Sequence, residues 1–319
     1  GQRMYLLLVS VHGLIRGHEL ELGRDADTGG QTKYVVDLAR ALAKRDDVDQ
    51  VDLVTRRVVD ARVSADYAEP IELLSPKARI VRIDAGPEEY LPKESLWDHL
   101  DSFGDNLVHW LNEQGYMPDL VHSHYADAGY VGVRLSGLLG IALVHTGHSL
   151  GRDKRQRLLA AGLPLEEIDR RYNLNRRVDA EEEVLANADL VITSTHQEIE
   201  DQYGLYDYYR PDRMAVIPPG TDLQQFHPPE SGAPAIPFVK QVSRFLTDAD
   251  KPLILALSRP DPRKNIGTLV DAYGQSPRLQ EIANLLIIAG SRDDIREMDE
   301  GAQSVLTEIL VAIDAYDIY

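Results

Sequence analysis

The stretch Asp27-Thr28-Gly29-Gly30-Gln31 decides the fold that we expect for this chain. It follows an apolar, β-branched run from Met4 to Val11, which predicts a buried strand. After it, apolar residues recur at helical spacing: Tyr34, Val35, Leu38, Ala39 and Leu42. The glycine pair thus lies where a strand crosses over into a helix. Glycine lets the backbone approach a ligand closely, and a helix N-terminus attracts anions, so the stretch predicts a site for a phosphorylated ligand. Packing alone is the alternative explanation for such a pair.

Composition narrows the class of protein. A chain of 319 residues suits two domains with a cleft between them. Lys and Arg number 34 against 52 Asp and Glu, a net charge of −18, which disfavours nucleic acid and anionic membranes as partners. The absence of cysteine excludes disulfide frameworks, thiolate zinc sites and cysteine nucleophiles. No apolar run approaches the ~18 residues of a membrane span, and no signal segment is evident, so we expect a cytoplasmic protein.

Short apolar runs alternate with helical patterns, which is typical of a parallel sheet covered by helices. The expected strands of the first domain are residues 4–11, 51–55, 80–83, 120–123, 142–146, 190–194 and 214–218. One apolar helical stripe covers residues 96–111, and a second long helix is expected to include Ile168, Tyr172, Val184 and Leu185.

A change in composition indicates two domains. Residues 1–218 form the first domain, and residues 219–251, rich in proline and glycine, form the linker. Residues 252–319 begin a second α/β unit, with strands at 253–258 and 285–289 and helices at 266–273 and 305–316. Two strands are fewer than the usual sheet of about five or six. We therefore expect this chain to be a fragment of a longer protein.

Two histidines stand where a predicted strand ends, in His122-Ser123-His124-Tyr125-Ala126-Asp127. Ligands of open α/β sheets bind at the carboxyl ends of the strands, so this position favours a functional role. The histidines share a face and could bind zinc, but no third ligand stands at a familiar spacing. We expect residues that line the cleft, or structural histidines, and no metal site.

A second histidine loop, Thr146 to Gly151, also ends a strand and precedes the basic run Arg152-Asp153-Lys154-Arg155. An imidazole beside free backbone amides suits a sugar hydroxyl or a phosphate. The next helix is expected to carry Arg170, Arg171, Arg176 and Arg177, with positions 170 and 177 on one face and Glu181 paired with Arg177. Solvated charges and helix-surface ion pairs are the alternative interpretation.

In the second unit, the segment from Ser258 to Asn265 leaves a strand and enters a helix. Arg259 and Lys264 place two cations beside that helix N-terminus, which suits a diphosphate leaving group that gathers negative charge as its bond breaks. The alternative is a basic loop neutralised by Asp261.

Together these motifs closely resemble the sucrose-phosphate synthase family over almost the whole chain. The matching stretches are residues 14–17, 23–31, 91–94, 146–151, 193–200, 216–220 and 259–265. The resemblance implies an α/β GT-B fold of two Rossmann-like, doubly wound parallel-sheet domains, the second incomplete here. It implies a glycosyltransferase that moves glucose from UDP-glucose to fructose 6-phosphate with retention, giving sucrose 6-phosphate and UDP. UDP-glucose is then a substrate, no cofactor is required, and Mg²⁺ is not expected as a protein-bound ligand.

The resemblance also implies roles for individual residues. Catalytic roles fall to His148, Arg259 and Lys264, with His148 bonded to the transferred glucose. Donor binding falls to Gly29, Gly30, Arg259 and Lys264. Acceptor binding falls to Gly30, Gln31, Lys93, Lys154, Arg176 and Arg177. An acceptor phosphate with a charge of about −1.5 to −2 would explain why cations gather on an acidic protein. No side-chain nucleophile is required.

Several alternatives remain open at this point. Transfers like those of sucrose synthase or mannosylfructose-phosphate synthase share the domain plan. A nucleotide-dependent oxidoreductase is disfavoured, because the first strand-to-helix turn lacks Gly-x-Gly-x-x-Gly with a later acidic residue. This chain could also be a non-catalytic sugar-phosphate-binding module. We expect the 319-residue chain to bind acceptor better than donor and to turn over little. Donor base preference, regulation and oligomeric state are left open.

Overall fold

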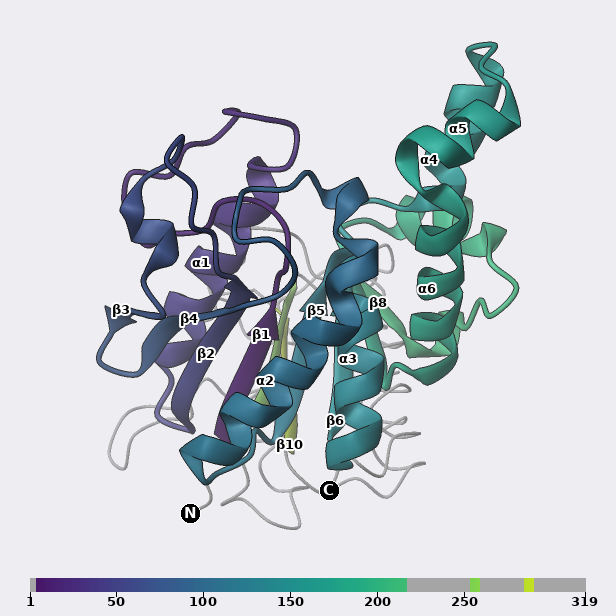
Figure 1. Ribbon diagram of the computed structural model, residues 1–319. Coiled ribbons are helices and arrows are strands. Elements are labelled where there is room, and N and C mark those ends of the chain that lie inside the picture. The colour runs from purple at the N-terminus through teal and green to yellow at the C-terminus, as the bar shows by residue number, and fades with distance from the viewer. Residues whose placement is uncertain (1–3, 217–252, 259–283, 290–319) are drawn as a thin grey trace.

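The computed structural model describes residues 4–216, 253–258 and 284–289. The first of these ranges contains one eight-stranded sheet in the order β3-β4-β2-β1-β5-β6-β7-β8 (Figure 1). Its strands are β1 (Met4–Val9), β2 (Val48–Arg56), β3 (Ile71–Ser75), β4 (Ala78–Ile83), β5 (Leu120–His124), β6 (Ala142–Thr146), β7 (Leu190–Thr193) and β8 (Met214–Val216). All neighbouring strands are parallel except β3 and β4.

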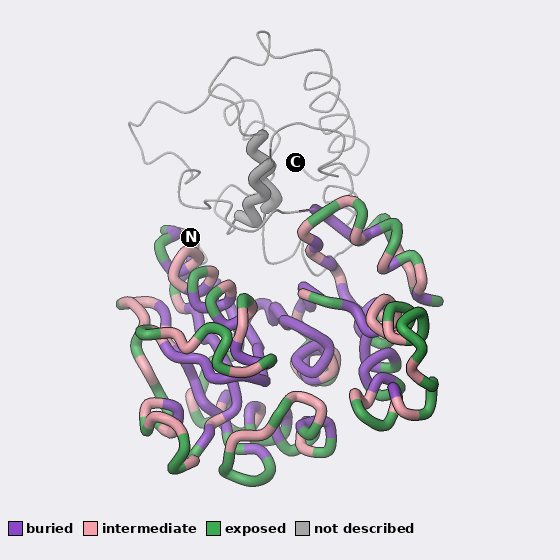
Figure 2. The backbone as a smooth tube through the Cα atoms, turned by 90° about the horizontal axis from the view of Figure 1, so that it is seen from above, coloured by how far each residue is buried: buried purple, intermediate pink, exposed green. Residues whose placement is uncertain are grey.

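β1 forms the centre of this sheet because every one of its side chains is apolar and buried. A strand buried on both faces reads as a continuous apolar run, which the sequence shows from Met4 onward. Tyr5, Leu7 and Val9 contribute to one large apolar core. The burial colours of Figure 2 place most of the buried backbone in the interior of the described part of the chain.

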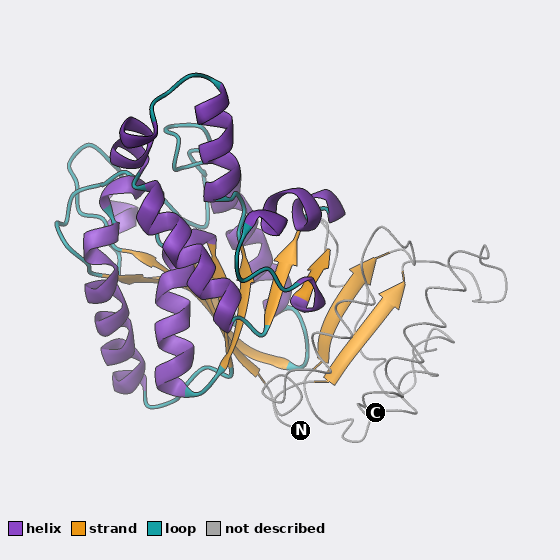
Figure 3. Ribbon diagram, turned by 90° about the vertical axis from the view of Figure 1, so that its right-hand side faces the viewer, coloured by secondary structure: helices purple, strands orange, loops and turns teal. Residues whose placement is uncertain are grey.

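Helices cover both faces of the sheet (Figure 1). They are α1 (Gly30–Ala43), α2 (Leu100–Gln114), α3 (Tyr125–Leu139), α4 (Gly151–Ala160), α5 (Leu165–Tyr172) and α6 (Leu174–Asn187). α2 and α3 lie on one face, where Phe103, Leu107 and Val131 pack in the same core as β1. α1 lies on the other face. α4 and α5 project beyond the carboxyl ends of the strands (Figures 1 and 3).

The sequence placed every expected strand of the first domain but missed β3. This strand is a short antiparallel edge strand, and Leu73 on it is largely exposed, so it lacks the buried apolar run by which the parallel strands were found. The long helix expected from Ile168 to Leu185 is also wrong. Asn173 adopts a left-handed backbone conformation (φ 50°), which separates α5 from α6. Asparagine tolerates this conformation better than most residues.

β9 (Leu253–Ser258) and β10 (Asn284–Ala289) form a parallel two-stranded sheet (Figure 3). Both strands confirm the sequence prediction, with β10 one residue longer than expected. The linker and the helices expected at 266–273 and 305–316 lie outside the described residues, so the domain boundaries stay predictions. None of the helices in the described ranges is both long enough and apolar enough to cross a membrane.

Candidate functional site

The strand order reverses between β1 and β5, because the chain adds strands on one side of β1 and later on the other. In open α/β sheets, ligands bind at the carboxyl ends of the strands at such a switch point. The Gln31 side chain lies there: its Nε2 donates to Ser10 Oγ (3.0 Å), just past β1, and to the carbonyl of His124 (3.4 Å), at the end of β5. The first turn of α1 therefore lies over the switch point.

The glycine pair opens α1 as the sequence predicted. Gly29 is the N-cap and has no side chain that could cap the helix, and Gly30 is the first helical residue. Apart from its own chain neighbours and helix backbone, a Cβ built on either glycine would meet no atom of the described residues within 4 Å. Nothing in the packing of the described residues therefore requires glycine here, which removes the packing explanation for the pair. The first N–H groups of a helix have no intrahelical partner, so this helix start can offer donors to an anion.

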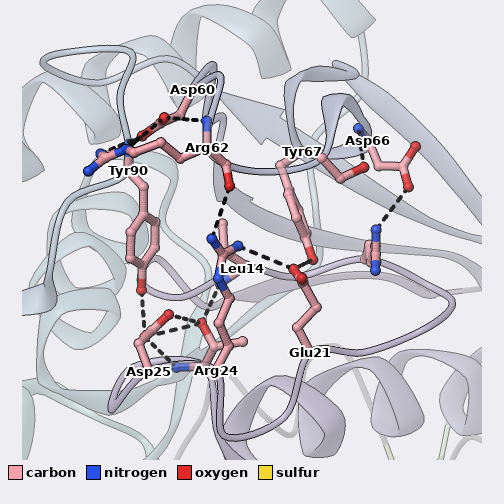
Figure 4. Close-up of polar contacts among 12 residues, drawn as sticks. Leu14, Glu21, Arg24, Asp25, Asp60, Arg62, Asp66, Tyr67 and Tyr90 are labelled. Carbon is pink, nitrogen blue, oxygen red and sulfur yellow. Dashed lines mark hydrogen bonds and ion pairs between the residues drawn. The ribbon is translucent and has the colours of Figure 1, made fainter.

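The turn before the glycine pair is held by Asp25 (Figure 4). Its carboxylate accepts hydrogen bonds from the backbone N–H groups of Asp27 (2.9 Å) and Thr28 (3.1 Å) and from the Tyr90 hydroxyl (2.8 Å). Burial opposes ionisation of Asp25, but the bonds from Tyr90 and from the backbone outweigh it and lower the pKa of this carboxyl. Thr28 Oγ1 in turn accepts from the N–H of Leu14 (3.2 Å). Asp25 thus ties the loop after β1 to the segment that leads to Lys93.

The two histidine motifs meet in space. His124 Nδ1 lies 2.9 Å from His148 Nε2, and His122 Nε2 lies 2.9 Å from Thr146 Oγ1. Burial lowers the pKa of His122 to about 3 and that of His148 to about 4. These imidazoles are neutral at pH 7, so they suit sugar hydroxyls better than phosphate. Among the described residues no group of three His, Cys, Asp or Glu side chains could bind a metal.

Three of the predicted acceptor residues form what we call the cationic cluster, Lys93, Lys154 and Arg177. The positive charges of Arg177 and Lys93 act on Lys154 and, after burial, are the main causes that lower its pKa. A hydrogen bond from Asn173 Nδ2 to the Glu94 carbonyl (2.7 Å) joins the segment of Lys93 to the start of α6. These interactions place residues that lie up to 84 positions apart in the sequence, from 93 to 177, in one region of the structure, and their role in acceptor binding stays a prediction.

The three cations differ in how their charge is balanced. Lys93 forms an ion pair with Asp27, and its N–H donates to the same carboxylate (2.7 Å). Arg177 lies 3.5 Å from Glu181 through Nε and donates from Nη2 to Ser149 Oγ (2.9 Å). Lys154 is half-buried, its ammonium lies 4.1 Å from the centre of the Tyr172 ring, and it has no ion pair within the described ranges. Lys154 thus carries a positive charge that a bound anion would neutralise.

The other predicted arginines lie elsewhere. Arg176 is exposed and pairs with Asp98 (2.5 Å), away from the contacts of Arg177. The expectation that positions 170 and 177 share one helix face is wrong, because Arg170 lies on α5 and Arg177 on α6. The pairing of Arg177 with Glu181 is confirmed, but it is buried rather than on the helix surface. Arg259 and Lys264 lie outside the described residues.

Sequence reasoning missed a histidine at the switch point. His12 follows β1 and its Nδ1 lies 2.8 Å from Asp127 Oδ2, with both side chains buried. The His12 ring packs edge-on against Tyr125, which itself lies under the guanidinium of Arg177 (4.6 Å to the ring centre). Tyr125 has a positive φ of 78°, which is strained for an aromatic residue and frequent at functional sites. The position of His12 just beyond a buried strand was the one signal available in the sequence.

A mostly parallel sheet with this switch point is a doubly wound α/β fold, and together with the family match and the solved relative reported next it places the chain in the GT-B class of glycosyltransferases. A family model described as Glycosyltransferase Family 4 matches residues 28–225, and the chain belongs to that family.

Individual relatives of the chain are more specific than the family model. The chain is 45% identical to a probable sucrose-phosphate synthase 1 of Oryza sativa subsp. indica and 45% identical to a sucrose-phosphate synthase of Zea mays. Each match covers the whole chain but only 35% and 36% of the relative, so the chain spans about a third of their length. A solved sucrose-phosphate synthase from Thermosynechococcus elongatus is 29% identical with a TM-score of 0.55, covering 99% of this chain and 68% of that one. The resemblance stated from the motifs is confirmed.

Proposed function

We propose that this chain belongs to an enzyme that transfers glucose from UDP-glucose to fructose 6-phosphate, with retention, to give sucrose 6-phosphate and UDP. The observation that carries the proposal is the cationic cluster, and above all Lys154, which forms no ion pair among the described residues and whose pKa burial and the charges of Arg177 and Lys93 lower, although Glu94 and Asp27 act in the opposite direction. A sugar without a phosphate would offer no anion to Lys154. The names of the relatives point to the same substrate class.

Each part of the site has a task in this proposal. Lys154, Arg177 and Lys93 bind the acceptor phosphate and so orient the ketose. The start of α1 gives its free N–H groups to a phosphate oxygen, and the neutral His148 exchanges hydrogen bonds with glucose hydroxyls. Arg259 and Lys264 are proposed to stabilise the departing diphosphate, and the donor phosphate takes the proton of the attacking hydroxyl. The proposal requires neither a side-chain nucleophile nor a cofactor.

Calorimetric titration of the 319-residue chain with fructose 6-phosphate and with fructose tests the proposal. We expect saturable binding of the phosphate ester and none of fructose at the same concentrations. An assay for sucrose 6-phosphate with UDP-glucose then separates an enzyme from a sugar-phosphate-binding module. Equal affinity for the two sugars would overturn the choice of acceptor.

Gly30→Ala is expected to separate stability from ligand binding. The added Cβ makes no close contact with the part of the chain that the structure describes, so the free energy of unfolding should change by less than about 1 kcal/mol. The same Cβ stands at the helix start where we place the ligand, and we expect fructose 6-phosphate to bind at least about tenfold more weakly, a loss of about 1.4 kcal/mol. Urea unfolding and calorimetry measure the two effects. Unchanged affinity would show that no ligand approaches this backbone.

Binding of the phosphate ester should weaken at alkaline pH. Burial and the neighbouring charges of Arg177 and Lys93 hold the pKa of Lys154 below its usual value in the free protein. A bound phosphate favours the ammonium and raises that pKa, so the complex keeps a proton that the free protein loses. Affinity is therefore complete below the lowered pKa and falls as the pH rises through the window between that pKa and the value in the complex. Calorimetry across this range, with Lys154→Arg as the variant that stays charged, should show the decline in wild type alone.

A further inference from the structure

Glu181 is a buried carboxylate on α6 to which the sequence assigned no function beyond pairing with Arg177. Only 3% of the residue is exposed. Its two oxygens accept from the N–H of Gly151 (3.0 and 3.1 Å), Oε1 also accepts from the Tyr206 hydroxyl (2.6 Å), and Oε2 faces Nε of Arg177 (3.5 Å). Three groups, one each from α4, α6 and the segment after β7, thus meet at this side chain.

Burial of the Glu181 carboxylate is energetically unfavourable, and packing alone does not explain why a carboxylate occupies this position. Burial raises the pKa of Glu181, even though Arg177, Tyr206 and the Gly151 N–H all favour the ionised form. The approach to α4 is so close that a Cβ at Gly151 would lie 2.7 Å from Glu181 Oε1. Buried ion pairs add little stability compared with apolar residues of similar volume, so a role in placing the bonded groups is the better explanation.

Two of the groups that Glu181 holds lead directly to the cationic cluster. Gly151 is the first residue of α4, and Lys154 follows it by three positions, about one turn of the same helix. Arg177 spans from Glu181 to Ser149 Oγ (2.9 Å), so its guanidinium is held from both sides. Movement of the Glu181 carboxylate would shift both cations relative to each other.

We propose that Glu181 is the positioning residue of the cationic cluster, fixing the distance between Lys154 and Arg177 to fit one phosphate group. This inference rests on the proposed function, since it takes the phosphate of the acceptor as the anion. Glu181 itself does not touch the phosphate in this arrangement; it acts through Arg177 and the start of α4.

Charge and positioning predict opposite results for Glu181→Ala. Removal of a negative charge beside the cluster would, by electrostatics alone, tighten the binding of an anion. Loss of positioning weakens it, and we expect the dissociation constant of fructose 6-phosphate to rise about tenfold, the effect of one hydrogen bond to a charged group. Glu181→Gln keeps an oxygen that accepts from Gly151 and Tyr206, so this conservative variant should recover most of the affinity.

Glu182→Ala is the matched control. Glu182 is the next residue of α6, and its carboxylate accepts from the N–H groups of Asp207 (2.8 Å) and Tyr208 (3.0 Å) and pairs with Arg152 (3.2 Å). It holds the same segment after β7, but it has no bond to Arg177 or Gly151. We expect Glu182→Ala to lose stability and to keep its affinity for fructose 6-phosphate.

Calorimetric titration of the 319-residue chain and these variants, with fructose 6-phosphate and with inorganic phosphate, tests the proposal. Weaker binding by Glu181→Ala but not by Glu182→Ala supports it, and equal or tighter binding by Glu181→Ala overturns it. Should Glu181→Ala not fold, Tyr206→Phe removes one bond to the carboxylate and should weaken binding about threefold; unchanged affinity there overturns it as well. If wild type binds neither anion, the proposed function fails together with this inference, whereas the outcomes above affect the inference alone.

Discussion

Replacement of Arg177 by methionine is expected to lower the free energy of unfolding by about 3–5 kcal/mol at pH 7, the usual cost of breaking a buried ion pair. Methionine still packs against Tyr125, but it leaves Glu181 buried without a cation, and the two side chains are only 4% and 3% exposed. The same change removes a donor to the proposed phosphate, so affinity for fructose 6-phosphate should fall about 100-fold, or about 2.7 kcal/mol. Urea unfolding and calorimetry measure the two losses.

The stability loss should depend on pH in a defined direction. Burial already raises the pKa of Glu181, and removal of Arg177 takes away the leading opposing influence. A carboxyl group with a raised pKa in the folded state destabilises the fold fully above that folded pKa, and the penalty declines as the pH falls from the folded to the unfolded value. The deficit of Arg177→Met should therefore shrink on acidification.

A double variant isolates the binding role of Arg177. Arg177→Met combined with Glu181→Gln leaves no buried charge, so we expect it to recover most of the lost stability and none of the lost affinity. A single Arg177→Met variant as stable as wild type at pH 7 would show that Glu181 does not depend on this cation.

Gly13→Ala is expected to be the most disruptive single-methyl change in the described part of the loop after β1. Gly13 has a φ of 84°, where a side chain is strained, and an added Cβ would lie 2.4 Å from the carbonyl oxygen of Asp27. Strain and clash act together, so we expect a loss of about 3 kcal/mol or more. The clash would also displace the turn before the glycine pair, and ligand affinity should fall with stability.

Gly23→Ala is the control for this variant. Gly23 lies in the same loop with a similar φ of 79°, but a Cβ there meets none of the described residues within 4 Å. It should lose only the conformational term of about 1–2 kcal/mol. Thermal or urea unfolding compares the two variants. An equal loss in the free energy of unfolding at both positions would mean that the clash with Asp27 does not contribute to the destabilisation.

Much of the candidate site was predictable from local patterns. The helix start at Gly30 follows from an apolar strand, a glycine pair and apolar residues at helical spacing, all of which act within about forty residues. His148 and Lys154 stand in motifs at strand ends, where α/β folds bind ligands. The convergence of Lys93, Lys154 and Arg177 was predicted through the resemblance, because no local rule brings together residues so far apart in the chain.

What the sequence by itself determined is the α/β class, the parallel strands and the position of the helix start at Gly30, because periodicity and turn residues act over short distances. Only the tertiary structure decided the rest. The tertiary structure divides the basic helical region at Asn173 and buries the ion pair of Arg177 and Glu181. It also lowers the pKa values of His122 and His148, so that both imidazoles are uncharged at pH 7. It also paired His12 with Asp127 across the switch point. These outcomes depend on burial and on contacts between strands that are distant in the chain, and neither is encoded in any one local stretch.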